Sequence, residues 1–192
     1  MENNETKSIT YNAVIRKQLI KTPIKDKNRK RVGSENWTFD LDCYKYDNQL
    51  KMITNILDNK YNHSDEVSKI AIQQIHRKIY GYKQQDIIKK LFNSGEFITF
   101  ESIINKMCQC ELKCYYCFCE MNVLYDISRE MKQWTVDRIN NDLGHNLTNY
   151  YLACLECNLK RRRRSDEKFL FTKQMKIIKV FGENNDNPVS LI

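Results

Sequence analysis

Two Cys-x-x-Cys pairs constrain this chain more than any other feature. The first pair is Cys114 and Cys117, and the second is Cys154 and Cys157. Each pair lets two thiolates turn back on one metal ion, and four thiolates complete the tetrahedron of a structural zinc site. Because such a site has no open coordination position, we expect this Zn²⁺ to hold the fold together and to take no part in catalysis.

Other assignments of the cysteines stay open at the level of sequence. Cys110 or Cys119 could replace Cys114 or Cys117 as a ligand if the loop differed slightly. A redox-active dithiol is a second interpretation of Cys-x-x-Cys, but it usually requires a thioredoxin-like strand and helix around a single pair. Two pairs on either side of a polar insert favour zinc.

Charge and composition narrow the class of partner. The chain has 192 residues, with 32 Lys and Arg against 24 Asp and Glu, and a formal net charge of +8. This excess favours a polyanionic partner, most simply nucleic acid, with a solvated basic surface as the alternative. No run of about 18 apolar residues indicates a membrane span, and the polar N-terminus lacks the apolar core of a signal peptide. We therefore expect an intracellular protein with reduced cysteines and no membrane contact.

A run of consecutive basic residues follows the second cysteine pair. These residues are candidates for contacts with nucleic-acid phosphates, and they are Lys160, Arg161, Arg162, Arg163 and Arg164. Ser165 comes directly after them and can cap a last helix, because its hydroxyl can accept a hydrogen bond from the first turn.

Both ends of the chain are expected to lie outside the compact body. Residues 1–35 are rich in Lys and Arg, which predicts a basic N-terminal arm along a phosphate backbone or, alternatively, a solvated terminus. Residues 182–192 are polar and predict a disordered tail.

Residues 36–107 predict a mainly helical subdomain. Polar and apolar residues alternate in 37–42, as in a short strand. Apolar positions recur at helical spacing in 50–57, and Thr99 is placed to begin a further short helix.

Residues 65–93 predict two helices. We expect Ser64 to cap the first, Tyr80-Gly81-Tyr82 to separate the two, and Ser94-Gly95 to end the second. The pair would pack as a simple helical hairpin or, alternatively, serve as a helix-turn-helix reader of DNA.

The insert between the cysteine pairs carries polar residues in a characteristic order. It contains Trp-Thr-Val-Asp-Arg-Ile-Asn-Asn from Trp134, then Gly144-His145 and Asn149, and the second pair runs directly into Asn158. With its two Cys-x-x-Cys pairs, this run resembles the HNH endonucleases. More narrowly, it is similar to the zinc-stapled ββα-metal nucleases of phages and large DNA viruses. The resemblance covers about residues 108–170.

The resemblance implies an α+β fold built around a β-hairpin followed by a helix. The strands would cover 133–138 and 149–153, and the helix would start near Cys157, within a nuclease domain at 108–181. It also implies a metal-dependent DNA endonuclease whose substrate is double-stranded DNA. A virus-encoded enzyme that acts in an infected host cell is compatible with the resemblance.

Phosphodiester cleavage of this type needs a divalent ion that polarises the phosphate. Mg²⁺ or Mn²⁺ would bind hard oxygen ligands and keep several waters, so one carboxylate and one amide oxygen suffice. Asp137 and Asn158 would supply them, and zinc would position Asn158 because it follows Cys157. Asn149 is expected to have a structural role, with its side-chain amide tying the loop to the backbone.

The general base is where the chain departs from the family pattern. The family usually has His directly after the metal-binding Asp, and this chain has Arg138 there. His145 is the one histidine in the insert, so we expect it to act as the general base, with Arg138 stabilising phosphate charge. The alternatives are that His145 only shapes the loop, or that catalysis has been lost.

Two rival functions share the zinc site and the charge. One is a non-catalytic zinc-knuckle protein that binds nucleic acid, and the other is a structural zinc protein that contacts other proteins. The set of Asp137, His145 and Asn158 favours the endonuclease, because neither rival needs an acidic residue beside a basic surface that binds DNA. Arg138 favours the first rival.

Overall fold

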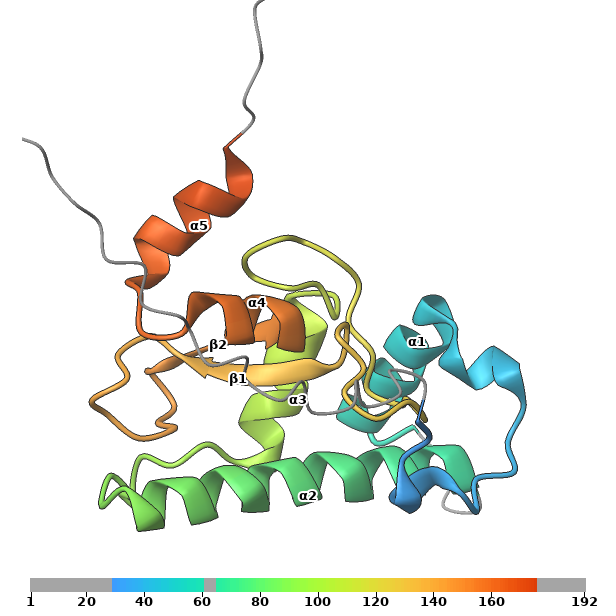
Figure 1. The fold of residues 1–192 in the computed structure, drawn as a ribbon. Helices are drawn as coiled ribbons and strands as arrows, with labels where there is room; N and C mark the ends of the chain where they lie inside the picture. The colour runs from blue at the N-terminus through green and yellow to red at the C-terminus, as the bar shows by residue number, and fades with distance from the viewer. Residues whose placement is uncertain (1–28, 61–64, 176–192) are drawn as a thin grey trace, which may run out of the picture.

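The computed structural model describes residues 29–60 and 65–175 (Figure 1). Most of the predicted basic arm, the predicted cap Ser64 and the predicted tail at 182–192 lie outside the described residues. Residues 29–35 of that arm belong to the folded body, since the Arg31 guanidinium donates to Tyr125 O at 3.0 Å and to Gln74 Oε1 at 2.9 Å.

The chain combines helices with one small sheet, an α+β architecture. The described elements in chain order are η1 (Val32–Ser34), η2 (Leu41–Tyr44), α1 (Tyr46–Leu57), α2 (Glu66–Ile88), α3 (Phe100–Gln109), β1 (Trp134–Arg138), β2 (Tyr150–Cys154), α4 (Leu155–Arg161) and α5 (Asp166–Gln174). In the described residues, no helix is both long enough and apolar enough to cross a membrane.

The sheet and the helix after it form one continuous unit. Strands β1 and β2 pair antiparallel, with Trp134 opposite Cys154 and Arg138 opposite Tyr150. Helix α4 starts at the residue that follows β2 and contacts both strands. Figure 1 shows α4 on one side of the sheet and the long helix α2 on the other. The predicted strands at 133–138 and 149–153 therefore agree with the observed strands to within a residue at each end.

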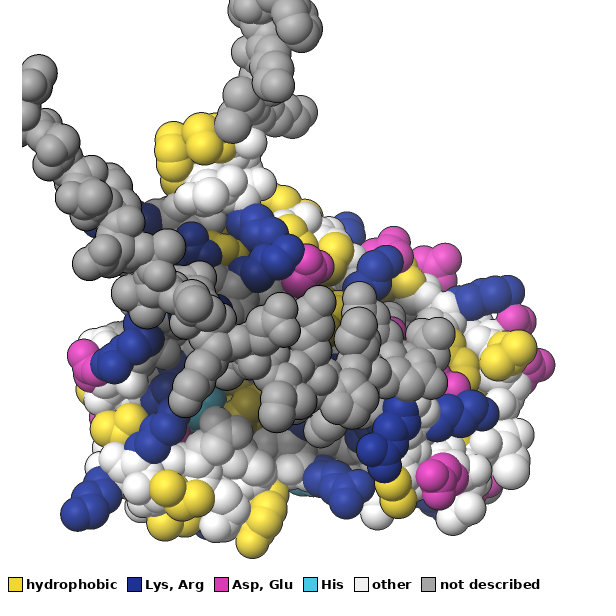
Figure 2. Space-filling model, viewed as in Figure 1, with side chains coloured by type: hydrophobic (Ala, Val, Ile, Leu, Met, Phe, Trp, Pro, Cys, Tyr) yellow, Lys and Arg dark blue, Asp and Glu magenta, His cyan; other side chains and the backbone are white. Residues whose placement is uncertain are grey.

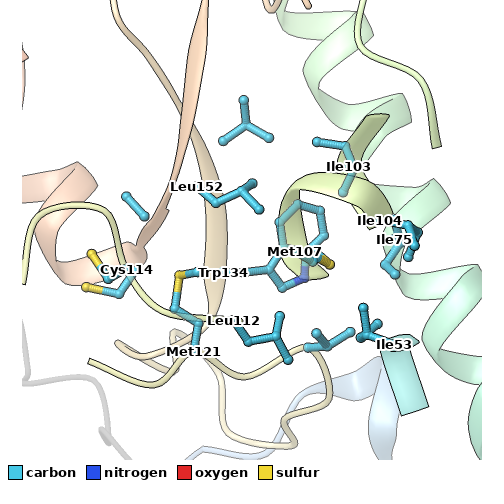
Figure 3. Close-up of a cluster of buried hydrophobic side chains, with 14 of the residues drawn as sticks. Ile53, Ile75, Ile103, Ile104, Met107, Leu112, Cys114, Met121, Trp134 and Leu152 are labelled. Atoms are coloured by element: carbon cyan, nitrogen blue, oxygen red, sulfur yellow. The ribbon is translucent and has the colours of Figure 1, made fainter. Parts of the chain in front are cut away.

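The hydrophobic core joins the helices to the sheet. Trp134 is fully buried and lies among Met107, Ile103 and Leu152, as Figure 3 shows. Ile75 of α2 belongs to the same cluster. Burying each of these side chains contributes about 1.5–3 kcal/mol, so α2 and α3 are held firmly against β1 and β2.

The predicted strand at 37–42 is wrong. Asp40 instead caps the short helix η2, with its side chain accepting a hydrogen bond from Asp42 N at 3.2 Å. A short acidic side chain that bonds to the nearby backbone competes with strand pairing, and here the local bond prevails.

The predicted division of 65–93 into two helices is also wrong. Helix α2 is continuous through Gly81, capped by Asp65 at its start, and ends at Ile88. An interior glycine costs about 1 kcal/mol relative to alanine, which the burial of apolar residues along α2 readily offsets. Because α2 is the one helix in 65–93, the helix-turn-helix alternative for this segment does not hold.

Two predicted helix starts are confirmed. Thr99 caps α3 through a capping box, in which Ser102 N donates to Thr99 Oγ1 at 3.1 Å. Ser165 caps α5, with its side chain accepting from Lys168 N. These two residues set the boundaries because their hydroxyls satisfy amide groups that a helix start leaves unpaired.

Candidate metal centre and active-site cleft

The four predicted zinc ligands converge. The sulfur atoms of Cys114, Cys117, Cys154 and Cys157 all lie within 4.8 Å of one another, and the Cys117 and Cys154 sulfurs are 3.9 Å apart. Tetrahedral zinc with bonds of ~2.3 Å separates its sulfur ligands by about 3.8 Å. The cluster is therefore compatible with one structural Zn²⁺.

Cys119 is a neighbour of the cluster and not one of its four members. Its thiol lies beside Cys117 and Cys154, and burial together with these two sulfurs raises the pKa of Cys119. Cys110, the other proposed substitute, lies outside the cluster, with its sulfur directed at Met107 O.

The cluster controls where α4 begins. Cys154 ends β2 and caps α4, because its sulfur accepts a hydrogen bond from Cys157 N at 3.4 Å. A metal bound to both cysteines would hold the junction between the sheet and the helix. The residues of α4 after Cys157 thereby take fixed positions relative to β1.

A cleft of about 420 Å³ lies along β1, between α2 and α4. Its lining includes the four residues predicted to be catalytic: Asp137, Arg138, His145 and Asn158. The sequence places these residues on a strand, a loop and a helix, and the fold brings them to one cavity.

Asp137 is buried and held by two donors. Tyr116 Oη donates to its Oδ2 at 2.7 Å, and Arg161 Nη1 donates to its Oδ1 at 3.1 Å. Burial raises the pKa of Asp137, while the hydrogen bond from Tyr116 and the charge of Arg161 act in the opposite direction. Each carboxylate oxygen has two lone pairs, so with these donors from the described residues both oxygens keep one for a further ligand.

The prediction that Arg161 contacts DNA is wrong. Its side chain is 0% exposed, and besides Asp137 it binds the carbonyl oxygens of Arg138 at 2.9 Å and Ile139 at 2.7 Å. The buried carboxylate and the end of β1 supply acceptors that draw this guanidinium inward. Arg161 therefore connects α4 to β1 and is not available at the surface.

The rest of the basic run is exposed. Lys160 pairs with Glu156, Arg163 pairs with Asp142 at 3.3 Å, and Arg162 and Arg164 also reach the surface. Figure 2 shows Lys and Arg side chains near α4 on the viewed face. That these four exposed residues contact phosphates stays a prediction.

Asn158 presents its amide beside β1. Its Nδ2 donates to Thr135 Oγ1 at 3.0 Å and to Val136 O at 3.3 Å. With the NH₂ group committed to the strand, the amide oxygen is the atom left to bind a cation or a substrate. Asn158 and Asp137 both line the cleft.

His145 is fixed by a second buried carboxylate. Its Nδ1 lies 2.7 Å from Asp86 Oδ1, its backbone N–H donates to Asp86 Oδ2 at 2.6 Å, and its ring stacks on Tyr82 at 4.7 Å. Burial lowers the pKa of His145 below its usual 6.5, and the adjacent Asp86 partly offsets that effect. The hydrogen bond to Asp86 favours the tautomer with its proton on Nδ1, which leaves Nε2 as the ring atom that can accept one.

Asp86 is a site residue that the sequence did not indicate. It lies on α2, is 0% exposed and is 59 positions from His145. The one available signal was Gly144: a Cβ at that position would lie 2.9 Å from Asp86 Oδ2 and 2.5 Å from Leu91 O. Gly144 therefore permits the close approach of the loop to the end of α2, but a sequence does not name the partner of such a glycine.

Asn149 holds the same loop in shape. Its Nδ2 donates to Asn140 O at 3.0 Å and to Gly144 O at 2.9 Å, and its Oδ1 accepts from Asn140 N at 2.9 Å. Arg138 adds a bond from Nη1 to Leu143 O at 2.9 Å. These contacts agree with the structural role expected for Asn149 and place Arg138 at the rim of the loop.

Lys78 is a further lining residue that the sequence did not indicate. Its ammonium donates to Gln133 Oε1 at 2.9 Å and to Trp134 O, and lies 4.6 Å from the Trp134 ring. Burial, together with the charge of Arg31, lowers the pKa of Lys78 to about 7. Lys78 therefore loses its charge more readily than a lysine in water.

Comparisons with known proteins do not identify this chain. No protein-family model, no curated protein and no solved structure matches it.

Proposed function

We propose that this protein is a metal-dependent endonuclease of the HNH, ββα-metal type that hydrolyses phosphodiester bonds in double-stranded DNA. The observation that carries the proposal is the convergence of Asp137, Arg138, His145 and Asn158 on one cleft. A net charge of +8 and the exposed basic residues of α4 support a polyanionic substrate.

His145 is suited to act as the general base. Its Nδ1–H donates to Asp86, so Nε2 accepts a proton from the attacking water. The lowered pKa keeps the imidazole neutral near pH 7, which is the state that a base requires. Arg138 lies in the same cleft and would stabilise the negative charge that develops on the phosphate.

Asp137 and Asn158 would hold a Mg²⁺ or Mn²⁺ ion. A carboxylate with one free lone pair on each oxygen and an amide oxygen fit a hard cation that keeps most of its waters. Such an ion, when bound, would polarise the phosphate and stabilise the leaving oxygen. The ion at the four cysteines would have a separate, structural role.

A non-catalytic nucleic-acid-binding protein is the second candidate. The observation that favours it is the ion pair between Arg161 and Asp137, which balances the carboxylate charge without a metal. Arg138 also favours the non-catalytic alternative, because the family that the chain resembles usually has a histidine at this position. Under this alternative the protein would bind DNA and leave it intact.

A plasmid-nicking assay separates the two candidates. We expect the wild-type protein to convert supercoiled DNA to nicked or linear DNA in Mg²⁺ or Mn²⁺, and His145→Gln to slow this by about 10²–10⁴-fold. Asp137→Asn, which keeps the shape of the side chain, should act similarly because it weakens the cation site. Circular dichroism should show both variants folded.

The control is Asn48→Gln, a substitution on the surface of α1 outside the cleft. It should nick at the wild-type rate. If the wild-type protein binds DNA but cuts it with none of these metals, the second candidate is correct. Undiminished cutting by His145→Gln would remove that residue from the role of base.

A further inference from the structure

Gly81 stands at an unusual position in α2. The helix runs from Glu66 to Ile88, so Gly81 is well inside it, where alanine would be more favourable by about 1 kcal/mol. None of the described glycines has a positive φ, so backbone conformation does not require a glycine here. Local structure therefore gives no reason for this residue.

Packing gives no reason either. A Cβ added at Gly81 would have no atom within 4 Å among the residues that the structure describes. Gly144 is the opposite case, since a Cβ there would lie 2.5 Å from Leu91 O. Gly144 is needed for the fold, whereas Gly81 leaves an open space.

The open space belongs to the cleft. Gly81 lines it together with Lys78, Tyr82 and Gln85, which lie on the same face of α2 at helical spacing. Leu159, on α4, lines the same cleft and is 46% exposed. One wall thus presents bare backbone, with the amino group of Lys78 a turn away, and the other wall contributes an exposed apolar side chain.

We propose that Gly81 keeps the cleft wide enough for the sugar–phosphate backbone of the DNA strand that is cut, which passes between α2 and α4. This inference rests on the proposed function and names where its substrate binds. A phosphate would favour the protonated form of Lys78 and accept its third N–H, and a sugar would pack between the glycine and Leu159. A side chain at position 81 would fill the volume that the strand needs, without touching the described core.

The test combines stability with DNA binding and cleavage in Gly81→Ala and Gly81→Leu. Both variants should be at least as stable as wild type, with Gly81→Ala melting about 2–4 °C higher because the helix gains about 1 kcal/mol. Gly81→Leu should cleave subsaturating DNA about 100-fold more slowly, mainly through a higher KM. The matched control is Tyr80→Leu on the neighbouring, 63% exposed position, which should cleave normally.

Binding of a fluorescent 20-base-pair duplex in Ca²⁺ separates this inference from the proposed function. If the wild type binds but does not cleave, the proposed function fails. Weaker DNA binding by Gly81→Leu than by the wild type and Gly81→Ala would still support the proposed position of the strand between α2 and α4. If folded Gly81→Leu binds and cleaves like wild type, the inference is wrong. Lower melting temperatures for both Gly81 variants would also overturn it, because the chain itself would then pack against this position. A wild type that neither binds nor cleaves DNA would overturn both.

Discussion

Two buried carboxylates support the cleft: Asp137 lines it, and Asp86 binds His145, which lines it. Asp137, on β1, is 4% exposed and pairs with the guanidinium of Arg161. Asp86, on α2, is 0% exposed and pairs with the imidazole of His145. Each acid has a basic partner within hydrogen-bond distance, so burial alone does not distinguish them.

The basic partners distinguish them. An arginine in a protein keeps its charge at every accessible pH, so the Asp137–Arg161 pair is a fixed connection between β1 and α4. An imidazole changes its charge near neutral pH, so the Asp86–His145 pair can exchange a proton. The first pair is therefore suited to hold the site in shape and the second to perform proton transfer.

Metal removal should disrupt the first pair most severely. Arg161 lies on α4, whose start is held by Cys154 and Cys157. Binding of structural zinc by short cysteine-rich modules contributes about 10–16 kcal/mol, more than the total stability of many domains. We expect chelation under reducing conditions to unfold the sheet and α4, seen as lost helical circular dichroism and fast amide exchange in α4.

Added Zn²⁺ should restore the signal, whereas Mg²⁺ should not, because thiolates prefer the softer ion. Amide exchange at Asp86 should rise less than at Arg161, since α2 carries none of the four cysteines. An unchanged unfolding curve after a zinc assay has shown complete metal loss would contradict the structural role of the ion.

Arg161→Met should have the next largest effect. It leaves the Asp137 carboxylate buried without its cation, which costs about 3–5 kcal/mol of unfolding free energy, measurable by urea denaturation. The matched control is Arg163→Met, because the Arg163 side chain is 84% exposed in its ion pair with Asp142. Its loss should change the free energy of unfolding by about 1 kcal/mol or less. Equal losses of unfolding free energy in Arg161→Met and Arg163→Met would contradict the view that the buried pair holds β1 and α4 together.

The two pairs also differ in how far the sequence predicts them. The cysteine cluster was predicted from the spacing of two Cys-x-x-Cys pairs, whereas the strands, the helix after them and the places of Asp137 and Asn158 were predicted from a resemblance. Arg161 was in the same motif but was assigned to the surface. Five consecutive basic residues look alike in a sequence, and only the packing of α4 on β1 turns one of them inward.

Asp86 could not be predicted from the sequence in the same way. It lies on α2, which contacts β1 where Tyr82 Oη accepts from Val136 N and Lys78 donates to Trp134 O, and no local spacing encodes those contacts. The error at Gly81 has the same origin. Glycine was taken as a helix break from local preference, whereas tertiary packing keeps α2 continuous.

Asp86→Asn should have the smallest effect on stability and a clear effect on chemistry. The asparagine can still accept from His145 N, so folding should change less than in Arg161→Met. The imidazole, however, loses the carboxylate that orients it and favours the proton on Nδ1. We expect DNA cleavage to slow by about 10²-fold or more, with little change in KM. Asp142→Asn, at an exposed carboxylate, is the control.

The pH dependence separates this positioning role from a merely structural one. Burial holds the pKa of His145 below 6.5, and Asp86 raises it. The activity of the wild type should therefore fall only as the pH drops below 6.5, and in Asp86→Asn the fall should begin at a still lower pH. Stability follows the same sign: the unfolded chain takes up the proton first, so His145 favours the fold above pH 6.5 and ceases to do so as the pH falls through its folded pKa. An acidic limb that stays in place in Asp86→Asn would show that the pair only packs the loop against α2.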